Sequence, residues 1–179
     1  MDKCLVIHIF WDIYRVKLQL MLTSIEKAFL ERAIELSRQG MESGKGGPFG
    51  CVVVKDNQIV GEGCNMVTSL NDPTAHAEVV AIRNACRQLQ AYQLTDCDIY
   101  TSCEPCPMCL GAIYWARPRR VIYANTREDA AMIEFDDAFI YNEINADMEK
   151  RKIPFLHEPH PLAQQIFRQW REWEEKSRY

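Results

Sequence analysis

The sequence has no excess of basic residues, no low-complexity tract and no internal repeat. Its 21 Lys and Arg residues are outnumbered by 25 Asp and Glu residues, which gives a formal net charge of −4. Without a basic field over the surface, a nucleic-acid partner is disfavoured. Apolar residues make up 47% and charged residues 26% of the 179, which excludes a disordered or collagen-like chain. This length predicts one domain with its own hydrophobic core.

Long uninterrupted apolar runs are also absent. The most apolar stretch, the first 22 residues, contains charged residues and no small-residue cleavage pattern, so it resembles neither a membrane span nor a secretory signal. We therefore expect a cytoplasmic protein with no membrane partner. We also expect residues 1–23 to be an extension that the fold does not need, and residues 24–179 to form the functional domain. The alternative is an ordinary strand or helix packed on that domain.

Helix and strand signals alternate along the rest of the chain. Ser24 is a suitable helix cap, and Asp72 followed by Pro73 is a second helix start. The segment 125–161 shows no regular pattern. The remaining signals predict helices over 24–40, 72–89, 108–116 and 162–176, a hairpin over 49–61, and strands over 98–101 and 121–124. This order predicts an α/β fold in which helices cover both faces of a mixed sheet of about five strands.

The eight cysteines are better explained as thiols or metal ligands than as a disulfide framework. Cys106 and Cys109 are three positions apart at a predicted helix start, which places both sulfurs on one side of a turn. Together with His76 they form a donor set that suits one catalytic zinc, because three protein ligands leave a fourth position for water. Glu78 can reach that water and move its proton. His-x-Glu followed by Pro-Cys-x-x-Cys is also the signature of zinc deaminases.

Three other interpretations of these residues stay open. The thiols and the histidine can coincide by chance, or Cys106 and Cys109 can act as a redox dithiol, which leaves His76 and Glu78 without a role. A closed structural zinc site with Cys103 as the fourth ligand is the third interpretation. We expect Cys103 to point into the core instead.

Longer motifs extend the similarity beyond the metal ligands. They are residues 46–50, 71–78 and 101–116, Phe135-Asp136-Asp137, and a chain that ends in tyrosine. On these motifs, residues 24–179 resemble the cytidine-deaminase-like superfamily of zinc-dependent deaminases, and within it the guanine deaminases of bacteria. The resemblance implies the three-layer cytidine-deaminase-like fold. It also implies hydrolysis of guanine to xanthine and ammonia by a zinc-bound hydroxide, with one zinc per chain and Glu78 as the proton shuttle.

The alternatives within the same chemistry are a guanosine deaminase and a tRNA adenosine deaminase, which shares residues 71–78 closely. The alternative outside catalysis is an interaction module that zinc stabilises. In place of the glycine that relatives usually carry, Glu134 precedes Phe135, so we expect an altered path for that loop.

The resemblance further implies which residues bind the purine: Phe49, Asn65, Ala77, Trp115, Phe135, Asp137 and Tyr179. It also implies a homodimer in which the C-terminal segments are exchanged, so that Tyr179 acts on the partner's site. Each residue has a simpler interpretation as well. Asn65 can be a turn residue, Asp137 a helix start, and Phe49 and Trp115 core residues, and a terminal tyrosine is usually frayed.

Overall fold

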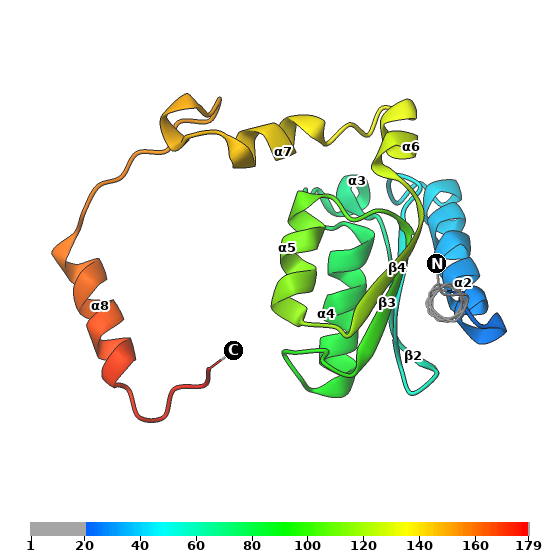
Figure 1. The fold of residues 1–179 in the computed structure, drawn as a ribbon, viewed down its shortest axis with the longest axis horizontal. Coiled ribbons are helices and arrows are strands. Elements are labelled where there is room, and N and C mark those ends of the chain that lie inside the picture. The colour runs from blue at the N-terminus through cyan, green and yellow to red at the C-terminus, as the bar shows by residue number, and fades with distance from the viewer. Residues whose placement is uncertain (1–20, 179) are drawn as a thin grey trace, which may run out of the picture. The chain divides into compact units, whose positions relative to one another are not determined.

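The structure is a computed structural model that describes residues 21–178 (Figure 1). The chain divides into two compact units, the first ending at Thr126 and the second beginning at Arg127. The first unit holds the sheet and confirms the α/β prediction, whereas the described part of the second unit is helical. The predicted extension lies almost entirely outside the described residues, so its boundary stays a prediction.

The sheet of the first unit has four strands in the described residues, against about five expected. They are β1 (Gly50–Lys55), β2 (Gln58–Cys64), β3 (Cys97–Cys103) and β4 (Arg120–Asn125), in the order β2-β1-β3-β4. β1 pairs antiparallel with β2 and β3, and β3 pairs parallel with β4. The sheet is therefore mixed, as predicted, and the parallel pair is joined by a helical crossover.

Helices cover both faces of this sheet (Figure 1). Helix α2 (Ser24–Glu42) packs on one face, against Val52 and Val54 of β1. Helices α4 (Ala77–Leu89) and α5 (Pro107–Ala116) pack on the other, against Cys51 and Val53. The alternation follows from the two-residue period of a strand, which sends neighbouring side chains to opposite faces.

Both long helices begin away from the predicted caps. The cap of α2 is Thr23 and not Ser24, because Thr23 and Glu26 form a reciprocal capping box. The second helix was predicted to start at Asp72. Instead, Asp72 accepts hydrogen bonds from the backbone and hydroxyl of Thr74, the chain turns there, and α4 starts at Ala77. His76 is therefore the N-cap residue of α4.

A short helix, α3 (Val67–Leu70), precedes α4. Two glycines of β2 allow α4 to lie close to the sheet. A Cβ at Gly61 would lie 2.5 Å from the backbone oxygen of Ala81, and one at Gly63 would lie 2.4 Å from that of Ala77. Larger residues at these positions would push α4, and His76 with it, away from the sheet.

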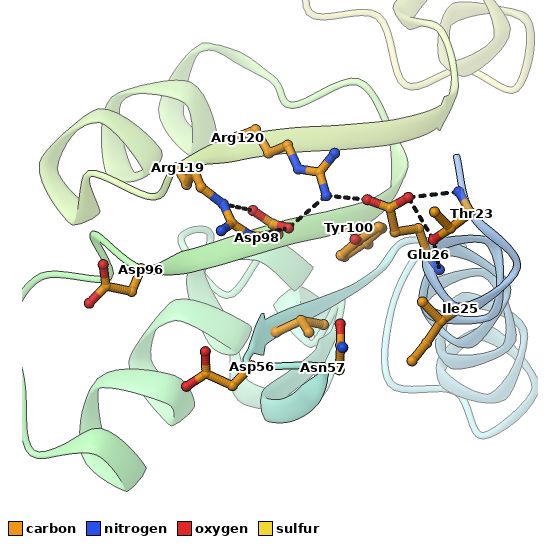
Figure 2. Close-up of a pocket in the computed structure, with 11 residues that line it drawn as sticks. Thr23, Ile25, Glu26, Asp56, Asn57, Asp96, Asp98, Tyr100, Arg119 and Arg120 are labelled. Carbon is orange, nitrogen blue, oxygen red and sulfur yellow. Dashed lines mark hydrogen bonds and ion pairs between the residues drawn. The ribbon is translucent and has the colours of Figure 1, made fainter. Parts of the chain in front are cut away.

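A network of ion pairs lines a cavity of about 430 Å³ at the start of β3 (Figure 2). The buried carboxylate of Asp98 accepts hydrogen bonds from both Arg119 and Arg120, and Arg120 also contacts Glu26 of α2. Residues 117–120 include three arginines, and two of them, Arg119 and Arg120, are paired with carboxylates. These pairs tie α2 and β4 to β3.

This network predicts that removing the charge of Arg120 lowers the stability of the protein at neutral pH. A backbone hydrogen bond from Thr23 and a side-chain bond from Arg120 lower the pKa of Glu26 from 4.5 to about 2. The stabilisation is thus present above pH 4.5 and is lost as the pH falls towards 2. We expect Arg120→Gln to lower the free energy of unfolding at pH 7, with a smaller difference from wild type at pH 3, measured by urea denaturation. Arg117→Gln, in the same cluster, is the control; an equal effect of both variants would contradict the prediction.

The second unit contains more regular structure than predicted. Residues 125–161 were expected to be irregular, but they contain helix α6 (Arg127–Met132), helix α7 (Ala138–Asn145) and a 3-10 turn, η1 (Met148–Lys150). The last predicted helix, 162–176, is α8 (Pro161–Glu172). No residue described in the second unit, 127–178, is buried, so its apolar side chains are not enclosed within the described chain.

Glu134 has a φ of 69°, in the left-handed region that glycine adopts without strain. Such a conformation costs a residue with a Cβ about 1 kcal/mol. Glu134 thus adopts a backbone conformation that glycine would adopt without this cost.

Candidate active site

Three metal-ligating side chains converge where α4 and α5 begin. The Nδ1 atom of His76 lies 3.5 Å from Sγ of Cys106 and 3.6 Å from Sγ of Cys109. All three ligand atoms lie within 4.8 Å of one another. The structure therefore brings together the three ligands predicted from the sequence, although they are up to 33 positions apart.

Local backbone signals explain this convergence. His76 and Cys106 are the N-cap residues of α4 and α5, and Pro107 begins α5, where its missing N–H costs nothing. Cys109 follows in the first turn of α5 and is fully buried. The positive ends of two helix dipoles therefore face the site, which favours thiolate ligands there.

The pKa values of the two thiols shift in opposite directions. The contacts of Cys106 with Cys109 and His76 lower the pKa of Cys106. The contact with Cys106, together with burial, raises the pKa of Cys109. A thiol with a lowered pKa beside an imidazole provides the donor chemistry that zinc prefers.

The donor set fits zinc with an open coordination position. Two cysteines and one histidine make the three-ligand arrangement of catalytic zinc sites, whereas structural sites are closed by a fourth protein ligand. Cys103, the proposed fourth ligand of a closed site, is buried elsewhere, with its Sγ 3.5 Å from the backbone oxygen of Thr126. Among residues 21–178, the ligand cluster contains His76, Cys106 and Cys109 and does not include Cys103.

Glu78 lies beside the three ligands and is 5% exposed. Its Oε1 accepts a hydrogen bond from Oγ1 of Thr101 at 2.9 Å, and its Oε2 accepts one from Sγ of Cys109 at 3.3 Å. Burial raises the pKa of Glu78. A raised pKa makes the protonated form of a carboxyl group easier to reach, which suits a group that must both take up and release a proton.

Asn65 has the turn role that the sequence allowed, and its role in purine binding stays a prediction. Its side chain is buried, and its Oδ1 accepts hydrogen bonds from the backbone N–H groups of Gly47 at 3.3 Å and Val67 at 3.2 Å. A Cβ at Gly46 would lie 2.1 Å from this oxygen, so glycine is needed there. The side-chain oxygen of Asn65 thus stabilises the turn. Its amide nitrogen is the side-chain group that could donate a hydrogen bond to a ligand.

The other predicted purine-binding residues of the first unit differ in their exposure. Phe49 is partly buried against the core, Ala77 is fully buried, and Trp115 is 65% exposed, so the core interpretation is wrong for Trp115. Phe135 and Asp137 belong to the second unit, and their role in the site stays a prediction.

The prediction for Asp137 as a helix start is correct in position, because it is the N-cap residue of α7. The backbone N–H of Ala138 donates a hydrogen bond to Oδ1 of the neighbouring Asp136. Tyr179 lies outside the described residues. No sequence signal marks Thr101 as part of the site, because a threonine within a buried strand has no distinctive pattern.

The fold and the site together define a class, the zinc-dependent deaminases. Residues 23–125 match the family described as the cytidine and deoxycytidylate deaminase zinc-binding region, and the chain belongs to this family. More particularly, the chain is 56% identical to the guanine deaminase of Bacillus subtilis over 153 residues, which are 86% of this chain and 98% of that protein.

A solved structure and a second relative are also similar to this chain. The crystal structure of guanine deaminase from Bacillus subtilis matches 88% of this chain and 99% of its own, with a TM-score of 0.84 and 54% identity. A tRNA-specific adenosine deaminase of Aquifex aeolicus is 40% identical over 96 residues, 54% of this chain and 63% of that protein.

Within residues 21–178, no helix is both long and apolar enough to cross a membrane.

Proposed function

We propose that this protein catalyses the hydrolytic deamination of guanine to xanthine and ammonia, with one zinc ion per chain. The observation that carries the proposal is the extent of its similarity to guanine deaminase. That alignment is longer than the zinc-binding region, so it reaches residues outside 23–125 and covers nearly all of the relative. The similarity to tRNA adenosine deaminase covers little more than half of the chain.

His76, Cys106 and Cys109 hold the zinc ion in this proposal. Zinc bound there acts as a Lewis acid that makes water a nucleophile at neutral pH. Glu78 is the proton carrier: it takes a proton from the attacking water and delivers it to the ring nitrogen beside the carbon that bears the amino group. The second proton of that water, released from the new hydroxyl on the ring carbon, passes through Glu78 to the amine, which leaves as ammonia while the oxygen stays on the carbon as a carbonyl.

The purine is held by polar and aromatic groups around the zinc site. The side-chain nitrogen of Asn65 donates to the ring carbonyl, since its oxygen is already bound by two backbone N–H groups. Because the Cβ of Ala77 is in the core, its backbone N–H at the start of α4 is the group that faces a ligand. Phe49 and Trp115 provide aromatic surfaces for the flat ring.

Ammonia release from a panel of substrates tests this proposal. The purified zinc-loaded protein is incubated with guanine, guanosine, cytidine and an adenosine-bearing tRNA anticodon stem-loop. We expect turnover of guanine above all the others. Preferred turnover of guanosine would mean that the site admits ribose, and release from the stem-loop alone would support a tRNA deaminase. No release with one zinc per chain would support a zinc-stabilised interaction module instead.

Asn65→Asp is expected to raise KM for guanine about tenfold or more, because one lost hydrogen bond of about 1.5 kcal/mol corresponds to that factor. The variant keeps the oxygen that Gly47 and Val67 bind, and it replaces the donor nitrogen by an oxygen that repels the ring carbonyl. Steady-state kinetics measure KM, and thermal melting checks that the fold persists. Asn84→Asp, at an exposed position of α4, is the control. An unchanged KM in Asn65→Asp would remove Asn65 from the purine site.

We further propose a homodimer with exchanged C-terminal segments, in which Tyr179 acts on the partner's site, and the exposed apolar side chains of the second unit support it. Ile166 and Trp170 lie four positions apart on α8, and each is about half exposed. A stripe of this kind is stabilised when a second surface covers it.

Complementation between two inactive chains tests the exchange. A Glu78→Gln chain is co-expressed with a chain that lacks Tyr179. If Tyr179 acts on the partner's site, the mixed dimer has one complete site and activity is restored. Light scattering gives the mass of the assembly. A monomer, or a mixed dimer without restored activity, would contradict the exchange.

A further inference from the structure

We propose that Thr101 is a positioning residue, whose hydroxyl holds Oε1 of Glu78 and leaves Oε2 as the oxygen that carries the proton. The inference rests on the proposed deaminase chemistry and on the role of Glu78 in it. It assigns different tasks to the two oxygens of one carboxylate. Thr101 itself does not contact the reacting atoms.

The two oxygens of Glu78 have different surroundings. Oε1 is directed to β3, where Oγ1 of Thr101 lies 2.9 Å away, whereas Oε2 is directed to the ligand cluster, 3.3 Å from Sγ of Cys109. Thr101 is 1% exposed and Glu78 is 5% exposed, so bulk water does not compete for either group. Oε2 is therefore the oxygen on the side where the reaction takes place.

The hydroxyl of Thr101 has one hydrogen and two acceptors in reach. The backbone oxygen of Gly50 lies 3.4 Å from Oγ1, which is farther than Oε1 of Glu78. The bond to a carboxylate is also the stronger type, since one partner is charged. The hydroxyl therefore donates to Oε1 and contacts Gly50 only weakly.

This arrangement also selects where a proton can reside on Glu78. A proton on Oε2 leaves Oε1 free to accept from Thr101, so the hydrogen bond is kept throughout the shuttle. A proton on Oε1 would meet the hydroxyl hydrogen and force it to turn to the more distant oxygen of Gly50. Because the terminal torsion of a glutamate is broad and roughly two-fold, a carboxylate that lacks the bond from Thr101 is less strictly limited to this orientation.

The hydroxyl can be removed with little change in shape. Thr101→Val deletes the donor and keeps the volume, and Thr101→Ser keeps the donor and deletes the methyl group. Ser102 of the same strand provides the control, because its hydroxyl is also buried but accepts from the backbone N–H of Gly50 at 3.0 Å. Ser102→Ala therefore removes a buried hydroxyl that does not contact Glu78.

We expect Thr101→Val to lower kcat about 10- to 100-fold, the effect of losing one hydrogen bond to a charged group, with KM changed less than about twofold. Thr101→Ser should recover kcat to within about threefold of wild type. Ser102→Ala should lower the melting temperature without lowering kcat. All variants should bind one zinc per chain. A wild-type kcat in Thr101→Val, or a Thr101→Ser variant as slow as Thr101→Val, would overturn the inference.

Crystal structures of the zinc-loaded wild type and Thr101→Val give a readout that does not depend on turnover. We expect the Glu78 carboxylate to be rotated, or present in two orientations, in the variant alone; an unchanged single orientation would overturn the inference. Kinetics use whichever panel substrate the wild type converts. A wild type that deaminates guanosine and not guanine thus refutes the proposed substrate and still tests Thr101. If the wild type converts none of the panel substrates, the two crystal structures alone test the role of Thr101.

Discussion

Replacing Glu78 by glutamine is expected to reduce the kcat for ammonia release roughly 10³-fold or more, within the range lost with a general acid-base group. Glutamine has nearly the same shape, and its oxygen can still accept the hydrogen bond from Thr101. Its amide cannot take a proton from water or return one to the purine. Because Glu78 is not among the three clustered ligands, zinc content should stay at one per chain.

Steady-state kinetics and metal analysis on the same preparation separate catalysis from metal binding. Glu62→Gln is a suitable control, since Glu62 of β2 pairs with Arg32 of α2 and lies outside the ligand cluster. It should alter stability slightly and leave kcat unchanged. A Glu78→Gln protein with a kcat near that of wild type would exclude Glu78 as the proton carrier. A variant that loses zinc would show that Glu78 supports the metal site instead.

The second large effect is expected from Cys109→Ser, which should abolish zinc binding and activity together. A serine hydroxyl is a hard donor with a high pKa, so it replaces a thiolate poorly. Cys109 is fully buried and is one of the three clustered ligands. The melting temperature should also fall towards that of the chelator-treated wild type, because a metal that binds the folded state stabilises it.

Cys103→Ser separates the open site from a closed one. Cys103 is a buried cysteine three positions before Cys106, and its sulfur contacts the backbone of Thr126 and not the ligand cluster. We expect this variant to keep one zinc per chain and most of its activity. Loss of zinc from Cys103→Ser, measured by metal analysis after dialysis, would indicate four protein ligands and a structural role for the metal.

Local signals were sufficient to predict the metal ligands and the helices that carry them. Cys106 and Cys109 share one side of a helical turn, and Pro107 marks where that helix begins, so their geometry depends on few residues. The start of α4 was harder to predict. Asp72 and Pro73 form a good helix start, but the side chain of Asp72 closes a turn onto Thr74 instead, and this competition is not visible in the pattern alone.

The sequence by itself determined the alternation of strands and helices, the zinc donor set and the presence of Glu78 beside it, because each depends on spacing along a single element or on a compact motif. Only the tertiary structure decided which groups meet across elements. It placed Thr101 of β3 on Glu78 of α4, directed the oxygen of Asn65 to two backbone N–H groups, and paired Arg119 and Arg120 with Asp98. Partners between elements depend on how strands and helices pack, and packing is a property of the whole folded unit.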